Sequence, residues 1–227
     1  MAAGEGRRLR PLTERWPKPI LPIDGKPIIG ALLRELAAAG VARTTIVTGH
    51  LAEQVESLVG DGAAWGLDVR FVRQPRPEGS ADAVRRALDG GARVPALITA
   101  ADTAYTDGDV ARFAASFAAS GTDGALAYRV GYEPTAAKPG VLVRDGLVEA
   151  VYDLTPGNPY TSAPLWALAE PLLPYLDDLP GPPYELLSAF GRIADSGLRV
   201  EPIEIGPTRT ITTTADLVRE NFVYLED

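Results

Sequence analysis

Cations, glycines and prolines are concentrated in residues 4–19, which read GEGRRLRPLTERWPKP. Glycine allows backbone N–H groups to approach phosphate oxygens, because no Cβ stands in the way. Arg8 and Lys18 can neutralise negative charge, and the three prolines restrict the backbone before a ligand binds. These residue types at this spacing predict a loop that binds an anion, and they suit a triphosphate.

The same loop resembles the signature of the sugar-1-phosphate nucleotidyltransferases, G-x-G-[ST]-R-x-x-P-x-T-x-x-x-P-K-P. The matching residues are Gly4, Gly6, Arg8, Pro11, Thr13, Pro17, Lys18 and Pro19. One position departs from the signature, because Arg7 stands where the family has Ser or Thr. A bare glycine pair is usually an ordinary turn, whereas this many matches at fixed spacing are hard to obtain by chance. The resemblance implies transfer of a nucleotidyl group from a nucleoside triphosphate to a sugar-1-phosphate, with release of pyrophosphate.

Length and periodicity set the expected fold. The chain has 227 residues with 46% hydrophobic content, which is enough for one sizeable core. We expect residues 1–227 to form a single nucleotidyltransferase domain. Apolar runs alternate with helical patterns and predict an α/β fold. The resemblance implies a three-layer α/β/α sandwich with a Rossmann-like mixed, mostly parallel sheet, of the nucleotide-diphospho-sugar transferase type.

The expected elements follow from the same patterns. We predict helices over residues 27–39, 51–59, 80–88, 109–120, 184–196 and 215–225. We predict strands over residues 44–48, 67–72, 96–99, 124–130, 140–143, 147–151 and 199–205, and a short strand that ends near Ile211. Arg144-Asp145-Gly146 is a typical hairpin turn and indicates antiparallel pairing in that part of the sheet.

The first strand of the family fold is short of residues in this sequence. Family members place a strand of several apolar residues before the glycine loop, and here only residues 1–3 precede Gly4. Losing a central strand would leave buried backbone groups unpaired, at about 1–3 kcal/mol each. Two explanations remain open: Met1 lies inside the true strand, which we favour, or the chain folds with a damaged core.

A second segment, residues 74–83, reads QPRPEGSADA and is similar to the family pattern Q-x-x-x-x-G-[ST]-[AG]-x-A. Gln74 can both donate to and accept from a base edge, and Gly79 allows a backbone N–H to reach that edge before Ser80 caps the helix. A proline-rich turn with a serine N-cap is the alternative for this segment. The resemblance gives a mild preference for a pyrimidine base. The nucleotide-binding residues that it implies are Ala2, Ala3, Gly4, Gly6, Gln74, Gly79 and Ser80.

The resemblance also implies a metal ligand. The family has Gly-Asp after an apolar strand, and this chain has Ala101-Asp102. Mg²⁺ prefers oxygen ligands and keeps several waters, so one or two carboxylates and a triphosphate can hold it. Asp102 fits this role, although an Asp after a strand is by itself more often a cap or a turn residue.

The second metal ligand of the family is replaced. Its D-I-G-T-x-x-D-L segment corresponds to residues 210–217, TITTTADL, so Thr210 stands at the position of the ligand. A hydroxyl carries no charge, so we expect weaker Mg²⁺ binding that depends on Asp102 and the nucleotide phosphates. Asp216 matches the Asp that begins a helix, and we expect it to stabilise that helix N-terminus.

The acceptor side departs further from the family. The usual E-K-P segment, whose lysine holds the acceptor phosphate, is replaced by residues 152–154, YDL. Gly140 matches the glycine that lies against the sugar, Lys138 could supply the missing cation, and Glu185 resembles a residue of the acceptor pocket or begins a helix. An ordinary hexose-1-phosphate is therefore not assured as the substrate.

The mechanism that the resemblance implies is in-line attack of an acceptor phosphate oxygen on the α-phosphorus, with pyrophosphate leaving. Arg8 and Lys18 would be the catalytic residues, Arg8 stabilising charge on the triphosphate as pyrophosphate leaves and Lys18 between the α-phosphate and the acceptor phosphate. His50, the only histidine, follows an apolar strand, and we expect it to be structural. The reaction needs no general base, because a phosphate oxygen is already a nucleophile.

Charge and composition exclude several classes of protein. The balance of charges is 22 − 30 = −8, and no basic run could follow a nucleic-acid backbone. No apolar stretch approaches the length of a membrane span, and no signal-peptide pattern begins the chain. The absence of cysteine excludes disulfides and thiolate metal sites, and a cytoplasmic location is the simplest expectation. The oligomeric state is left open, a homo-oligomer included.

Two other functions stay open. Thr210 and the YDL segment favour a nucleotide or nucleotide-sugar binding module that has lost turnover. The same departures also fit an enzyme with a different acceptor, such as an alditol or amino-alcohol phosphate.

Overall fold

The computed structural model describes residues 1–136, 138–194 and 196–222, and the chain divides into two compact units. Unit 1 contains residues 1–77 and 100–108 and the segment that begins at Thr208, while unit 2 contains Glu78–Thr99 and Asp109–Pro207. Each unit is therefore built from segments that are distant in the sequence.

Unit 1 combines a pair of parallel strands with short helices. Its elements, with η for 3-10 turns, are η1 (Arg7–Leu9), η2 (Leu12–Glu14), η3 (Lys18–Ile20), β1 (Pro22–Ile23), β2 (Lys26–Pro27), α1 (Ile28–Ala38), β3 (Arg43–Thr48), α2 (Ala52–Val59), η4 (Ala63–Trp65), β4 (Asp68–Arg73) and α6 (Thr214–Arg219). β3 and β4 pair in parallel, with Ile46 beside Phe71, and the β-branched residues of β3 suit this pleated surface. The predicted helices α1 and α2 and both strands are confirmed within one residue at each end. The β1–β2 hairpin was not predicted.

Residues 1–3 lie where the first strand of the family fold is expected, and two of them form strand-like backbone hydrogen bonds. Ala2 forms a parallel bridge with Thr48, and its N–H donates to the carbonyl oxygen of Val47 (2.7 Å). The carbonyl oxygen of Met1 accepts from the N–H of Ala101 (2.9 Å). Of the first strand that the family resemblance implies, the described residues contain this short piece, bonded on both sides.

The core of unit 1 joins the glycine loop to the end of the chain. Leu9, Leu21, Ile28 and Ile211 are buried in one cluster with Ile23. Burying a side chain of this size contributes about 1.5–3 kcal/mol, so apolar packing anchors the loop at Leu9 within it and at Leu21 just after it.

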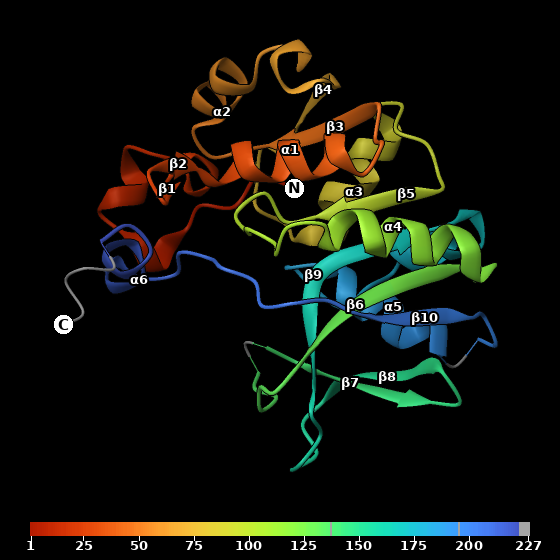
Figure 1. Ribbon diagram of the computed structural model, residues 1–227. Coiled ribbons are helices and arrows are strands. Elements are labelled where there is room, and N and C mark those ends of the chain that lie inside the picture. The colour runs from red at the N-terminus through yellow and green to blue at the C-terminus, as the bar shows by residue number, and fades with distance from the viewer. Residues whose placement is uncertain (137, 195, 223–227) are drawn as a thin grey trace. The chain divides into compact units, whose positions relative to one another are not determined.

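Unit 2 is built on a mixed sheet with helices on both faces; Figure 1 shows α4 on one face and α5 on the other. Its elements are α3 (Ser80–Asp89), β5 (Ala96–Thr99), α4 (Asp109–Ser120), β6 (Gly124–Val130), β7 (Gly140–Arg144), β8 (Leu147–Asp153), β9 (Tyr160–Leu168), η5 (Glu170–Leu176), α5 (Leu186–Ala194) and β10 (Val200–Glu204). The strand order is β10-β6-β9-β7-β8, and β5 also pairs with β9. β10 runs parallel to β6, whereas β9 runs antiparallel to both β5 and β6. The predicted mixed sheet is confirmed, with β5, β6 and β10 sharing one direction.

β9 is central to this sheet and was not predicted. Its sequence carries Pro164, and proline within an apolar run argues against a central strand because it cannot donate to the ladder. The register of β6 and β9 shifts between the pairs Leu126–Trp166 and Tyr128–Ser162, so Pro164 lies in a bulge. A bulge removes the need for regular ladder bonds at that residue, which is how proline is accommodated.

Three other predictions differ from the structure at the C-terminal side. The strand expected near Ile211 is wrong, because only an isolated bridge between Ala104 and Arg209 forms there. The helix expected over residues 184–196 begins later, as α5, and residue 195 lies outside the described residues. The helix expected over residues 215–225 is the shorter α6, and residues 223–225 also lie outside the described part. Within the described ranges no helix is long and apolar enough to cross a membrane.

Candidate functional site

The signature loop of unit 1 folds into the three 3-10 turns η1, η2 and η3. Gly6 has a φ of 62°, and a Cβ added there would lie 2.9 Å from the methyl carbon of Thr13. Any other residue would be strained and would clash, so this turn requires glycine. Thr13 is buried, and its hydroxyl donates to the carbonyl oxygen of Gly6 (2.9 Å). The motif match gave Thr13 no role, and the structure shows that it holds the glycine turn closed.

His50 lies against the same turn. Its Nε2 is 2.5 Å from the carbonyl oxygen of Thr13, and its backbone N–H donates to the carbonyl oxygen of Ala3 (3.4 Å). These contacts fix loop backbone and fit the structural role that we expected for this histidine.

Lys18, Asp102 and Thr210 are brought together from three segments of unit 1. The Nζ of Lys18 lies 2.5 Å from Oδ2 of Asp102 and 3.4 Å from the hydroxyl oxygen of Thr210. The Thr210 hydroxyl donates to the carbonyl oxygen of Asp102 (2.8 Å). The side chains of Lys18 and Asp102 are 14% and 30% exposed, so the ion pair is partly shielded from water. The structure therefore unites the predicted catalytic lysine, the predicted metal ligand and the residue that replaces the second ligand.

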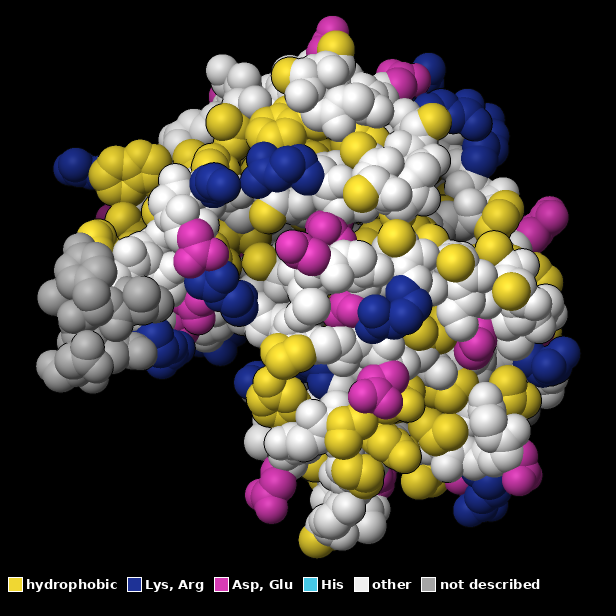
Figure 2. Space-filling view, in the orientation of Figure 1, with side chains coloured by type: hydrophobic (Ala, Val, Ile, Leu, Met, Phe, Trp, Pro, Cys, Tyr) yellow, Lys and Arg dark blue, Asp and Glu magenta, His cyan; other side chains and the backbone are white. Residues whose placement is uncertain are grey.

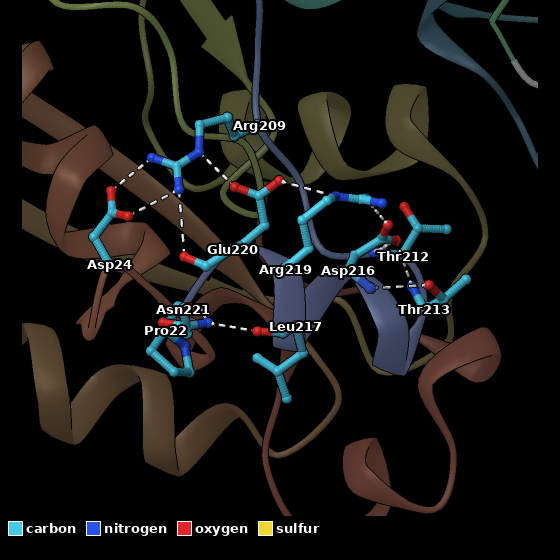
Figure 3. A network of polar contacts seen from close by, with 10 residues as sticks. All are labelled: Pro22, Asp24, Arg209, Thr212, Thr213, Asp216, Leu217, Arg219, Glu220 and Asn221. Carbon is cyan, nitrogen blue, oxygen red and sulfur yellow. Dashed lines mark hydrogen bonds and ion pairs between the residues drawn. The ribbon is translucent and has the colours of Figure 1, made fainter. Parts of the chain in front are cut away.

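Backbone and side-chain bonds hold the Thr210 segment in place. Ala104 and Arg209 exchange two backbone hydrogen bonds (2.8 and 2.9 Å), which set the next residue against Asp102. The Arg209 guanidinium contacts both carboxylate oxygens of Asp24 (2.6 and 2.9 Å) and one of Glu220 (2.5 Å). Figure 3 shows this guanidinium between the two carboxylates. Hydrogen bonding to Asp24 raises the pKa of Arg209, and the same bond lowers the pKa of Asp24. No sequence signal pointed to Arg209 as a positioning residue.

We expect Arg209→Met to destabilise the protein by about 1–2 kcal/mol, because bidentate charge-assisted bonds are lost and Glu220 is left without this partner. Urea denaturation at pH 7 measures the loss. The pKa of Asp24 is lowered in the fold, so its contribution is present above pH 3.8 and is lost as the pH falls through the folded pKa. The difference between the two proteins should therefore shrink below pH 3.8. A difference that stays constant across this range would contradict the assignment.

Asp216 lies in the first turn of α6 and stabilises its N-terminus, as expected. Its side chain accepts from the backbone N–H of Thr213 (2.8 Å), while the Thr213 hydroxyl accepts from the N–H of Asp216 (3.2 Å). This reciprocal capping box stabilises the helix N-terminus that Figure 3 shows in the same network.

The remaining cations of the loop differ in their partners. Arg7 and Arg10 both contact the carboxylate of Glu5, at 2.7 and 3.3 Å. The hydrogen bond from Arg7 lowers the pKa of Glu5. Arg8 is exposed, and its side chain has no hydrogen-bond or ion-pair partner among the described residues. The Arg8 guanidinium is thus accessible to a phosphate.

The donor set around Asp102 fits a divalent cation that brings other ligands with it. Among the described residues no group of three or more His, Asp or Glu side chains could hold a metal ion by itself. Asp102 offers one carboxylate, and the Thr210 hydroxyl is already donated to a backbone oxygen. Mg²⁺ commonly uses one or two protein carboxylates with water and substrate phosphates, and Asp102 meets that need.

The other predicted nucleotide-binding residues of unit 1 lie near the loop or beside β3. Ala2 and Ala3 are buried, whereas Gly4 is exposed and nothing lies within 4 Å of a Cβ added there. Gln74 is buried, and its N–H donates to the carbonyl oxygen of Thr48 at the end of β3 (2.8 Å). The structure places Gln74 directly after β4, as the pattern predicts.

Gly79, Ser80 and Glu185 belong to unit 2 and lie together. The Ser80 hydroxyl donates to Glu185 (2.6 Å) and accepts from the N–H of Leu186 (2.7 Å). The prediction that Ser80 caps its own helix is wrong: Gly79 is the N-cap of α3, and the Ser80 hydroxyl bonds the first residue of α5 instead. Gly79 has a φ of 110°, and a Cβ there would lie 2.3 Å from the carbonyl oxygen of Tyr184. Backbone packing thus gives a reason for glycine that the sequence did not reveal.

The predicted acceptor segment of unit 2 is closed by its own hydrogen bonds. A Cβ at Gly140 would lie 2.2 Å from the carbonyl oxygen of Asp153. The carboxylate of Asp153 accepts from Thr155 (2.6 Å) and Asn158 (2.5 Å), and the bond from Thr155 contributes most to lowering its pKa. Lys138 is exposed, with its Nζ 5.5 Å from the ring centre of Tyr132. The structure leaves the Lys138 ammonium accessible in this segment.

Apolar side chains also gather on this part of unit 2, and Figure 2 shows them over the β7–β8 hairpin. Leu142, Tyr152 and Leu154 are among the exposed large hydrophobic residues. The hydroxyls of Tyr152 and Ser188 lie 3.0 Å apart, which holds one side chain of the YDL segment toward α5.

A sequence model described as "Nucleotidyl transferase" matches residues 1–153 of the 227. The chain belongs to the nucleotidyl transferase family. The matched region contains the glycine loop, Gln74, Asp102 and Gly140, whereas Glu185, Thr210 and Asp216 lie beyond it. The predicted family is confirmed.

Curated nucleotidyl transferases resemble parts of the chain. An N-acetylmuramate alpha-1-phosphate uridylyltransferase of Neisseria meningitidis is 43% identical over 75 residues, 33% of this chain and 32% of that protein. A glucose-1-phosphate thymidylyltransferase of Streptomyces antibioticus is 40% identical over 84 residues, 37% of this chain and 24% of that protein. A mannose-1-phosphate guanylyltransferase of Mycobacterium tuberculosis is 40% identical over 80 residues, 35% and 22% of the two chains. The chain thus spans about a third or less of these relatives.

Solved nucleotidyl transferase structures resemble nearly the whole chain. A Bacillus anthracis protein assigned as a glucose-1-phosphate thymidylyltransferase superimposes with a TM-score of 0.85 at 18% identity, covering 98% of this chain and 92% of that one. A UDP-glucose pyrophosphorylase in complex with UDP-glucose gives 0.81 at 19% identity, covering 99% and 96%. At this identity the likeness concerns the fold, and it confirms the predicted fold class.

Proposed function

We propose that this protein transfers a nucleotidyl group from a nucleoside triphosphate to a sugar-1-phosphate or a similar small phosphate. An acceptor phosphate oxygen would form a bond to the α-phosphorus, the bond between the α-phosphorus and the bridging oxygen would break, and pyrophosphate would leave. The observation that carries the proposal is the meeting of Lys18 with Asp102 beside a closed glycine loop that presents Arg8. The partial relatives, all transferases of this reaction type by name, support it.

The catalytic roles follow from charge. Arg8 would stabilise the negative charge that grows on the leaving pyrophosphate, and Lys18 would hold the α-phosphate and the acceptor phosphate together. Mg²⁺, which Asp102 would hold, would neutralise phosphate charge when bound. Fixed cations of this kind act without reorganising during the reaction, which is why we assign most of the catalysis to electrostatics.

Binding roles complete the proposal. In unit 1, Ala2, Ala3, Gly4, Gly6 and Gln74 would bind the nucleotide, and in unit 2 we retain the same role for Gly79 and Ser80. We retain the mild preference for a pyrimidine base, although the relatives named above use uridylyl, thymidylyl and guanylyl groups. We further propose that both units belong to one functional domain and that the protein acts in the cytoplasm.

For the acceptor we propose Gly140, Lys138 and Glu185, with Lys138 replacing the lysine that the YDL segment lacks. The accessible ammonium of Lys138 supports this role. Relatives use phosphates of glucose, mannose or N-acetylmuramate, and an alditol or amino-alcohol phosphate remains the alternative for a reshaped pocket.

A second function is a nucleotide-binding module without turnover. The observation that favours it is Thr210, whose hydroxyl is donated to the Asp102 backbone and adds no charge to the metal position. This module would bind a nucleotide but would not release pyrophosphate.

Pyrophosphate release with Mg²⁺ tests both functions, with the common nucleoside triphosphates crossed against sugar-1-phosphates and other small phosphates. We expect acceptor-dependent release that falls about 10²- to 10³-fold in Arg8→Ala. Arg15→Ala is the matched control, because Arg15 is an exposed arginine of the same loop outside the signature. Binding without release would support the module, and activity within a few-fold of wild type in Arg8→Ala would remove Arg8 from the mechanism.

A further inference from the structure

Lys18 occupies the oxygen of Asp102 that a cation would use. Its Nζ lies 2.5 Å from Oδ2, and both side chains are partly shielded from water. A divalent cation bound to the same carboxylate would lie close to the ammonium, and like charges at such distances repel strongly where water is partly excluded. The ammonium and a free cation therefore compete for Asp102.

Thr210 strengthens the position of Lys18. Its hydroxyl proton is used by the carbonyl oxygen of Asp102, so a lone pair of the hydroxyl oxygen remains for the ammonium 3.4 Å away. The Arg209 bonds to Asp24 and Glu220 fix the segment that carries this hydroxyl. Lys18 is thus held by a carboxylate and a hydroxyl that are themselves fixed.

We propose that Lys18 fills the cation position at Asp102 while the nucleotide is absent, and that phosphate oxygens of an arriving triphosphate draw Lys18 away. A divalent cation would then bind Asp102 together with the triphosphate, whereas the free protein would bind the cation poorly. This inference rests on the proposed function, because it assumes that the loop binds a triphosphate. Coupling of this kind is reciprocal, and typical coupling changes affinity about 5- to 150-fold.

Binding of Mn²⁺ alone tests whether Lys18 fills the cation position at Asp102 in the free protein. Free Mn²⁺ is measured by electron paramagnetic resonance in the absence of nucleotide. We expect Lys18→Met to bind Mn²⁺ about 5- to 150-fold more tightly than the wild type. Asp102→Asn in the Lys18→Met background should abolish the gain. Lys26→Met is the matched control, because Lys26 is an exposed lysine of unit 1 on β2 and its replacement removes the same charge. Lys18→Gln repeats the test if the methionine variant does not fold.

Binding of metal-free triphosphate in EDTA tests whether the phosphates draw Lys18 away from Asp102. A double-mutant cycle of Asp102 and Lys18 measures this coupling. Asp102→Asn should bind UTP and GTP more tightly than the wild type, because Lys18 is released for the phosphates. This gain should vanish in the Lys18→Met background. Glu14→Gln, an exposed carboxylate of the same loop, controls for the loss of one negative charge.

The outcomes separate this inference from the proposed function. Equal Mn²⁺ affinity in the wild type and Lys18→Met would overturn the inference. So would a gain in triphosphate affinity in Asp102→Asn that persists without Lys18. In both cases, triphosphate binding by the wild type would leave the proposed function standing. Failure of the wild type to bind any triphosphate, even with Mg²⁺, would overturn the proposed function and this inference with it.

Discussion

We expect replacement of Lys18 with methionine to lower kcat for the proposed pyrophosphate release by about 10²- to 10³-fold. The ammonium contacts Asp102 and Thr210 in the free protein, and we expect the phosphates of a bound triphosphate to take it over as their own cation. Methionine keeps the length and the apolar stem of the side chain but cannot donate a hydrogen bond or carry charge. Steady-state kinetics at saturating Mg²⁺ and triphosphate measure the loss.

Stability and charge controls separate this effect from damage to the fold. The ion pair with Asp102 is partly exposed, and we expect its loss to change the free energy of unfolding by about 1 kcal/mol or less. Lys26→Met removes the same charge from the exposed β2 position and should leave kcat near the wild-type value. A kcat for Lys18→Met within threefold of wild type would show that Lys18 has no catalytic role.

We expect replacement of Gly79 with alanine to destabilise the protein by about 2–5 kcal/mol, through backbone strain and overpacking together. Gly79 has a φ of 110°, and the new Cβ would meet the carbonyl oxygen of Tyr184 at 2.3 Å and its nitrogen at 2.4 Å. These are backbone atoms whose residue is tied to the same turn, since Tyr184 donates to Glu78 and accepts from Ala81. They cannot move away as a flexible side chain would. Urea or thermal denaturation measures the effect.

Gly91 supplies the matched control for the backbone conformation. It has a φ of 98°, and nothing lies within 4 Å of a Cβ added there. Gly91→Ala should therefore show the strain alone, about 1–2 kcal/mol. Equal losses at the two positions would mean that the close approach of Tyr184 contributes nothing.

Much of the fold could be predicted from sequence patterns. The bounds predicted for β5, α4 and β6 coincide with those in the structure, because each is a periodic apolar segment between clear turn residues. β9 was missed because its proline is tolerated only through a bulge, and the bulge depends on the register with β6. A pattern within one segment cannot report the geometry of its neighbour.

In the candidate site too, the residue types were predictable from the sequence, whereas contacts with distant segments were not. Arg8, Lys18 and Asp102 were predicted from the resemblance to the family motifs, and the structure joins Lys18 to Asp102 across 84 positions of sequence. The hydroxyl of Ser80 was assigned to the wrong helix, because its bond to Leu186 is a tertiary contact. Arg209 gave no signal, and Thr13 matched the signature without a role, since each acts through a partner that the sequence places elsewhere.

The buried cluster of unit 1 contains Leu9 from the start of the chain and Ile211 from near its end. During translation, a ribosome releases the glycine loop long before it has synthesised Ile211. Leu9 and Leu21 therefore lack their packing partner Ile211 while the residues of unit 2, up to Pro207, are synthesised. The buried cluster that anchors the glycine loop can therefore be completed only after residue 211 has left the ribosome.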